Sequence, residues 1–167
     1  MNSFDPEPLL RRPAHIPERA KFPVIDAHNH LFGDYSPQEL LNVMDEVGVR
    51  MFVNITGNTT LPFENNCYTI VRRDIGIFPD GYVMAYPGRF AAVTMADFAQ
   101  WGDPVLIKDD AFADKCIQQL EADIERGARG LKVSKELGLY FQDHAGQMLA
   151  VDDERLFPIW RRAGELG

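Results

Sequence analysis

Two histidines separated by one residue, His28 and His30, close an apolar segment at 24–30. Side chains two positions apart on a strand share a face, so Asp26, His28 and His30 are expected to point the same way. Two imidazoles at the carboxyl end of a strand can hold one divalent metal ion, with zinc the preferred candidate. The alternative is a chance pair of polar residues that cap a strand. The apolar residues before the two histidines and the loop after them favour the metal site.

The bulk composition limits the classes of function. The chain has 167 residues, of which 46% are hydrophobic, enough for one domain with a real core. Its net charge of −8 argues against nucleic acid or an anionic membrane as a partner. No segment approaches the ~18 consecutive apolar residues of a membrane span. The two cysteines, Cys67 and Cys116, are expected to be free thiols in helices, which fits a reducing, cytoplasmic compartment.

The chain divides into a proline-rich arm at 1–22 and one domain at 23–167, in which strands and helices alternate. Strands are predicted at 24–30, 50–56, 90–94 and 130–134, and 82–86 is left open as a further short strand. Ser36-Pro37-Gln38-Glu39 is a capping box that starts a helix, and Gly48 ends it. Further helices are predicted at 63–75, 111–126 and 153–165. An excursion at 136–151 is expected to hold a small hairpin.

This alternation implies an α/β fold with a parallel sheet and helices outside it. No Gly-x-Gly-x-x-Gly follows the first strand and no Walker-type loop occurs, which disfavours a nucleotide-binding doubly wound fold. A (β/α)8 barrel places its active site at the carboxyl ends of its strands. His28 and His30 fall at such a position, so the barrel is the preferred architecture.

Three segments are similar to a known family. They are PVIDAHNHL from Pro23, GARGLKVSKELGL from Gly127 and VDDERLFPIW from Val151. Together they resemble the amidohydrolase superfamily, specifically its amidohydrolase-related (amidohydrolase 2) branch. The resemblance covers about residues 22–167 and implies a metal-dependent TIM barrel.

The resemblance also implies roles for individual residues. His28 and His30 match the family's metal pair, and Asp26 matches the acidic residue before it, in a supporting catalytic role. Lys132 is favoured over Lys135 as the site lysine, because a lysine inside a parallel strand must find a carboxylate, a metal-bound group or water. Binuclear relatives carbamylate a lysine near this position, whereas this branch more usually holds a single metal.

Two further residues are candidates for binding substrate. Asn54 interrupts an apolar strand near its carboxyl end, and a purely structural hydrogen bond is weighed equally with a place in the pocket. Lys135 follows the fourth strand, where a solvated loop charge is the alternative.

A complete (β/α)8 barrel needs about 250 residues, and only about four βα units are predicted here. The family's remaining ligands, a histidine after strand five and an aspartate after strand eight, have no counterpart among residues 1–167. We therefore expect the N-terminal half of a barrel that binds zinc weakly and is inactive alone. A homo-oligomer of the intact protein is left open.

The implied activity is hydrolysis of a small molecule, in which metal-activated water attacks an amide, lactone or ester carbon. One alternative is a metal-dependent non-oxidative decarboxylase on the same scaffold. The other, of a different class, is a non-catalytic half-barrel whose open sheet edges bind a partner.

Overall fold

A computed structural model describes residues 17–33, 35–64, 67–68, 71–95 and 104–167. Most of the predicted arm at 1–22 lies outside these residues. In the described part of the arm, Ala20 N donates to Val47 O at 3.2 Å. At the start of the domain, Val24 N donates to the neighbouring Gly48 O at 3.2 Å.

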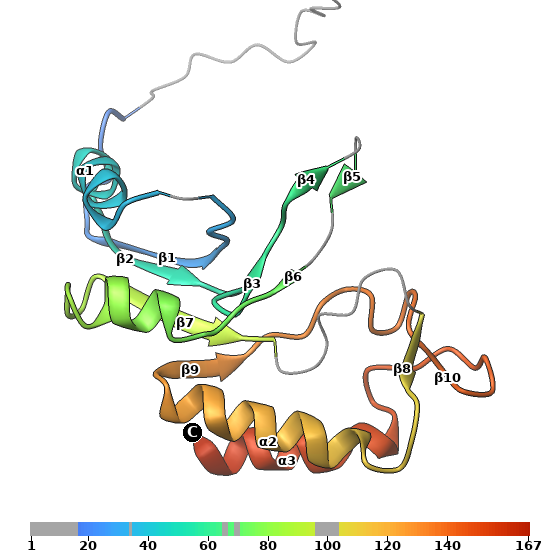
Figure 1. Cartoon of the computed structure of the whole chain (residues 1–167). Coiled ribbons are helices and arrows are strands. Elements are labelled where there is room, and N and C mark those ends of the chain that lie inside the picture. Colours follow the sequence, from blue (N-terminus) through green and yellow to red (C-terminus); the bar gives the residue numbers. More distant parts are fainter. Residues whose placement is uncertain (1–16, 34, 65–66, 69–70, 96–103) are drawn as a thin grey trace, which may run out of the picture.

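A parallel four-stranded sheet forms the centre of the fold (Figure 1), which confirms the predicted α/β class. Its strands are β1 (Val24–Asn29), β2 (Val49–Asn54), β7 (Phe90–Thr94) and β9 (Ala128–Leu131), and they are neighbours in that order. Each new strand joins the sheet beside the previous one, without a reversal of order. All four carboxyl ends therefore meet at one edge, and β1 and β9 are the outer strands.

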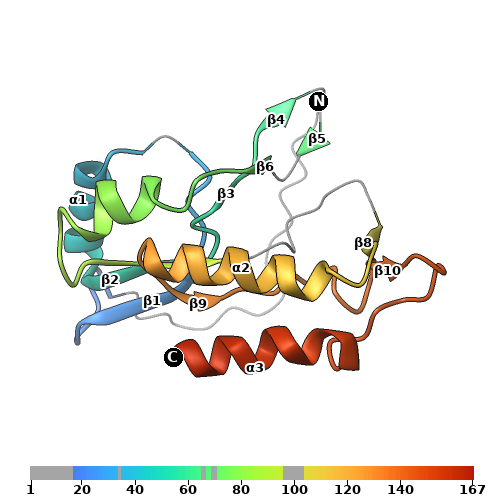
Figure 2. The same ribbon diagram turned by 60° about the horizontal axis from the view of Figure 1, so that its bottom comes forward.

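The helices follow the strands along the chain. Helix α1 (Pro37–Val47) packs against β2, and the short π-helical segment η1 (Pro79–Val83) packs against β7. Helix α2 (Phe112–Glu125) packs against β9, and α3 (Phe157–Leu166) lies beside α2 (Figure 2). One buried cluster lies between the sheet, α1 and η1, and a second joins α2 and α3 to the loop at 137–149. No helix in the described ranges is long and apolar enough to cross a bilayer.

Helix α1 begins and ends where the sequence predicts. The Ser36 hydroxyl accepts from Glu39 N at 3.2 Å, and the Glu39 carboxylate accepts from Ser36 N at 2.8 Å, which completes the capping box. Gly48 takes the left-handed conformation at φ 83°, which a residue with a Cβ adopts only with strain. These local signals fix the helix that carries the chain from β1 to β2.

Ser36→Ala is expected to lower the free energy of unfolding by about 1 kcal/mol, because the backbone N–H of Glu39 loses the hydroxyl that caps it. Urea unfolding followed by circular dichroism measures this effect. The control is Glu46→Ala at an exposed position of the same helix. Equal losses for the two variants would show that the capping box does not stabilise α1.

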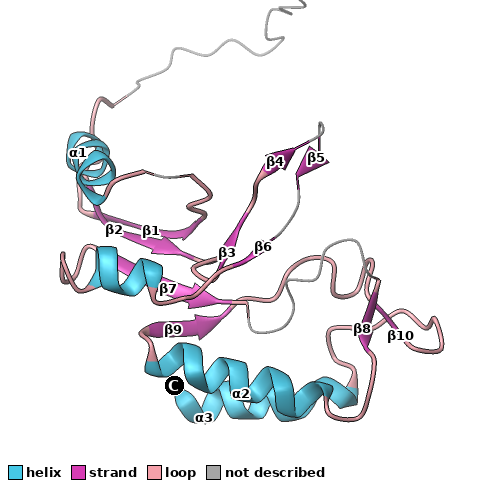
Figure 3. Ribbon diagram, in the orientation of Figure 1, coloured by secondary structure: helices cyan, strands magenta, loops and turns pink. Residues whose placement is uncertain are grey.

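The helix predicted at 63–75 is wrong. The segment instead forms short antiparallel pairs (Figure 3), in which β3 (Thr59–Thr60) pairs with β6 (Val71–Arg72) and β4 (Phe63–Glu64) pairs with β5 (Cys67–Tyr68). Glu64 pairs with Cys67 and Phe63 with Tyr68 in antiparallel register, a pairing that a helix cannot make. The prediction that Cys67 lies in a helix is therefore also wrong, whereas Cys116 lies in α2 with its side chain buried, as predicted.

Other boundaries shift by a few residues. The segment at 82–86 forms no strand, since η1 occupies its start. The fourth strand spans Ala128–Leu131 rather than 130–134. The last helix begins with a 3-10 turn, Glu154–Leu156, before α3. A small parallel pair, β8 (Val105–Ile107) with β10 (Gln142–Asp143), was not predicted.

The excursion at 136–151 contains the expected tight turn, since Gln142 bridges Met148 in antiparallel fashion. Buried Asp143 organises the turn. Its carboxylate accepts from Ala145 N and Gln147 N, each at 2.9 Å, and from Arg155 Nη1 at 2.9 Å. The Gln147 backbone donor and then the Arg155 guanidinium hold the pKa of Asp143 below its ordinary value.

Asp143 is therefore expected to make the free energy of unfolding depend on pH in the acid range. A carboxylate with a depressed folded pKa stabilises fully above its ordinary pKa of about 3.9 and loses that contribution as pH falls through the folded pKa. Asp143→Asn should be less stable than wild type at pH 6, and the difference should shrink toward pH 3. Urea midpoints at the two pH values measure this, and a difference that stays constant would contradict it.

Candidate functional site

A hollow of about 550 Å³ opens at the carboxyl edge of the sheet, and we call it the histidine hollow. Its lining comes from β1, from the loops after β2 and β9, and from Met95 after β7. The polar lining residues central to the site are His28, His30, Thr56, Lys132, Lys135 and Glu136. The apolar wall is Phe32, Leu61 and Met95.

The two histidines share this hollow, as the strand period predicts. Their ring centroids lie 5.9 Å apart, edge to face at 74°. The ring of Phe32, two residues further on, stacks on His30 at 5.0 Å. Alternate residues 28, 30 and 32 therefore extend one face into the hollow.

A hydrogen-bond chain fixes the tautomer of His30. Thr56 Oγ1 donates to Asn54 Oδ1 at 3.3 Å, which uses its single hydroxyl proton. Thr56 Oγ1 must then accept from His30 Nδ1, 3.1 Å away. In the neutral ring this leaves the lone pair on Nε2, the form in which an imidazole binds metal. Desolvation in the hollow, followed by the charges of His28 and Lys132, lowers the pKa of His30, so the neutral ring prevails at pH 7.

Thr56→Val is expected to weaken zinc binding roughly tenfold, because His30 loses the acceptor that sets its tautomer. Isothermal titration with zinc measures the effect. Thr59→Val is the matched control, since Thr59 lines the same hollow but its hydroxyl bonds to Thr56 O instead. Equal zinc affinities for both variants would show that the hydrogen bond from His30 to Thr56 does not support zinc binding.

Asn54 is fully buried and is not among the residues that line the histidine hollow. Its side-chain oxygen accepts from Leu31 N at 3.4 Å and from Thr56 N at 3.1 Å, as well as from the Thr56 hydroxyl. These contacts match the structural alternative and not the predicted contact with substrate. Asn54 holds the loop that presents Thr56 to His30.

Asp26 is not among the residues that line the histidine hollow. The pairing of β1 with β2 is irregular after Asp26, since Asp26 lies opposite Phe52 and Asn29 opposite Asn54. The extra residue on β1 breaks the alternation of faces. Asp26 accepts from Asn29 Nδ2 at 2.7 Å and lines a second hollow against α1, which His30 also lines.

Both candidate lysines line the histidine hollow. Lys132 lies just after β9 and not inside a strand, although its backbone N still donates to Thr94 O at 2.6 Å. Lys132 is partly buried and lies near enough to His30 to influence its pKa. Lys135 is exposed. Of the two lysines, Lys132 therefore has the closer relation to the histidines.

Glu136 is a residue that the sequence did not single out. It is only 9% exposed and lines the same hollow as the histidines. Its position after the fourth strand was the available signal, because residues just past strand ends form the rim of such sites. The sequence does not indicate that Glu136, rather than one of the polar residues beside it, is buried.

The donor set fits part of a metal site. Zinc–nitrogen bonds of about 2.0–2.1 Å are compatible with two rings whose centroids are 5.9 Å apart. Within the described residues, no three His, Cys, Asp or Glu side chains come together as a ligand set. His28 and His30 would thus hold a divalent ion weakly, with water or other groups completing the coordination.

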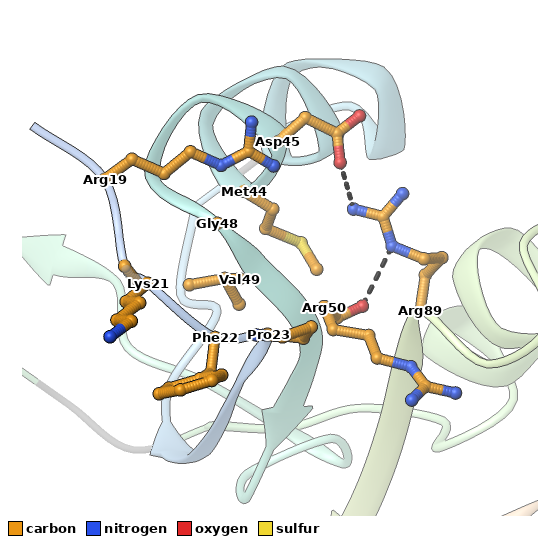
Figure 4. Close-up of a pocket in the computed structure, with 11 residues that line it drawn as sticks. Arg19, Lys21, Phe22, Pro23, Met44, Asp45, Gly48, Val49, Arg50 and Arg89 are labelled. Carbon is orange, nitrogen blue, oxygen red and sulfur yellow. Dashed lines mark hydrogen bonds and ion pairs between the residues drawn. The ribbon is translucent and has the colours of Figure 1, made fainter.

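A second hollow, of about 600 Å³, lies at the opposite end of the sheet, between the arm, α1 and the starts of β2 and β7 (Figure 4). Arg19, Lys21, Arg50 and Arg89 surround it. Arg89 is already paired with Asp45 at 2.6 Å, and Lys21 and Arg50 point away from each other in Figure 4. These cations do not converge on one point, so this hollow is a weaker candidate.

Comparison of the chain with protein-family models, with curated proteins and with solved structures finds no match.

Proposed function

We propose that this chain carries part of the active site of a metal-dependent hydrolase related to the amidohydrolases, built on a (β/α)8 barrel. The observation that carries the proposal is the pair His28 and His30, which line one hollow at the carboxyl edge of a parallel sheet. Barrel enzymes build their active sites at this edge.

The sheet supports the barrel half of the proposal. Its order β1-β2-β7-β9 has no reversal, whereas doubly wound folds reverse at a switch point. Strand β1 is an outer strand, and Val24 and Ile25 on it are 40% and 57% exposed. Parallel strands are normally covered on both faces, so these side chains suit a strand that further barrel strands would enclose.

The residues of the histidine hollow would have separate roles in this reaction. His28 and His30 hold the ion, and Thr56 keeps the His30 lone pair on Nε2. A bound divalent ion supplies Lewis acidity, which polarises a carbonyl and lowers the pKa of water. The Lys132 ammonium would attract and orient an anionic group of the substrate. Phe32, Leu61 and Met95 exclude water from one wall of the hollow.

The gene beyond codon 167 provides the first test. A further strand ending in histidine and a later strand ending in aspartate would supply the missing ligands, and an immediate stop codon would contradict the barrel. The longest product of the gene would then be assayed on lactones and amides, with and without chelator. We expect chelator-sensitive hydrolysis. Release of CO₂ from an aromatic acid would instead indicate the decarboxylase, and no turnover of either class would favour a non-catalytic module.

A further inference from the structure

The histidine hollow contains a largely buried acid, Glu136. Glu136 is 9% exposed, and no hydrogen bond or ion pair joins its carboxylate to another residue in the described part of the chain. The carboxylate oxygens are not themselves enclosed, so a ligand in the hollow can reach them, and a cation or strong donor that does so is favoured. The hollow therefore has one point that favours a positively charged group.

The backbone holds Glu136 in place. Its carbonyl accepts from Leu139 N, Tyr140 N and Phe141 N, and Leu137 N donates to Ser134 O within the same turn. A carboxylate on a turn fixed in this way is preorganised, and binding does not have to pay for ordering the loop.

The opposite charge lies beside the histidines. Lys132 follows β9 directly and is held there by its bond to Thr94 O. It is partly buried, whereas Lys135 on the same hollow is exposed and better screened by water. The hollow thus offers a cation next to the imidazoles and an anion at Glu136.

We propose that the histidine hollow binds a small dipolar molecule, with an anionic group at Lys132 and a cationic nitrogen at Glu136. Such a molecule would be the substrate class of the proposed hydrolase, and in this respect the inference rests on the proposed function. The binding itself requires no metal.

The test uses three linear probes on the full metal-free chain, followed by NMR titration. These are 6-aminohexanoate, hexanoate and hexylamine. The dipolar probe is expected to bind about tenfold more tightly than either singly charged one. Glu136→Gln should remove its advantage over hexanoate, and Lys132→Met should remove its advantage over hexylamine. Glu154→Gln, at an exposed position, is the control that should change neither preference.

Equal binding of 6-aminohexanoate and hexanoate to the wild-type chain would overturn the inference. The carboxyl ¹³C chemical shift of Glu136 tests the inference in the wild-type chain. It should change on addition of 6-aminohexanoate and remain unchanged on addition of hexanoate. Zinc titration of the wild-type chain separates the two proposals. Zinc binding at His28 and His30 with no preference for 6-aminohexanoate refutes this inference alone, whereas a preference for 6-aminohexanoate without zinc binding at His28 and His30 refutes the metal site alone.

Discussion

Replacing His28 by alanine is expected to weaken zinc binding by about 100-fold or more, and His30→Ala should do the same. The two rings are the chain's own candidate ligands, and loss of a direct ligand should exceed the 10–100-fold loss seen when a ligand's supporting hydrogen bond is removed. Isothermal titration with zinc measures the change. Both histidines are exposed, so the free energy of unfolding should change by no more than about 0.5 kcal/mol.

The matched control is His144→Ala. His144 is also exposed but lies in the turn after β10, outside the histidine hollow. Its removal should leave zinc affinity unchanged. If His144→Ala weakens binding as much as His28→Ala, zinc binds at scattered surface imidazoles and the proposed site is wrong.

Asp123→Ala is expected to lower the free energy of unfolding by about 3 kcal/mol. Asp123 is 3% exposed on α2, and its carboxylate accepts from the Thr94 hydroxyl, from Asn58 Nδ2 at 3.5 Å and from Gln119 Nε2 at 2.8 Å. Thr94 and Asn58 are themselves buried, so each would lose its bond to this carboxylate in a place that water does not readily reach. Urea unfolding at neutral pH measures the loss.

Glu125→Ala, at an exposed position of the same helix, is the control and should change stability by no more than about 0.5 kcal/mol. A loss in Asp123→Ala no greater than in this control would mean that the buried carboxylate does not join α2 to the sheet. Asp123 also matters for the site, because Asn58 belongs to the loop at 55–59 that presents Thr56.

Local signals in the sequence predicted the framework well. Ser36, Glu39 and Gly48 act within one or two turns of the chain, so the bounds of α1 could be predicted from neighbouring residues. The four sheet strands are apolar runs, and their alternation with helices was enough to predict a parallel sheet. The placement of both histidines on one face needed only the period of a strand.

The errors arise where distant pairing decides the structure. Residues 63–75 have no strong local preference, and antiparallel pairing makes strands of Phe63–Glu64, Cys67–Tyr68 and Val71–Arg72. Asp26 does not line the histidine hollow, and β1 gains a residue against β2 just after it, an irregularity that depends on the partner strand. The burial of Asn54 and of Glu136 depends on loops that fold over them, which no spacing in the sequence reveals.

The central claim is that His28 and His30 bind one metal ion together. The most direct measurement is zinc titration of the ¹⁵N-labelled chain, followed through the ring nitrogens of its histidines. We predict that His28 and His30 shift together at one zinc per chain, that His30 coordinates through Nε2 and that its Nδ1 proton is retained. Shifts that appear first at His144, or at only one ring of the pair, would contradict the account.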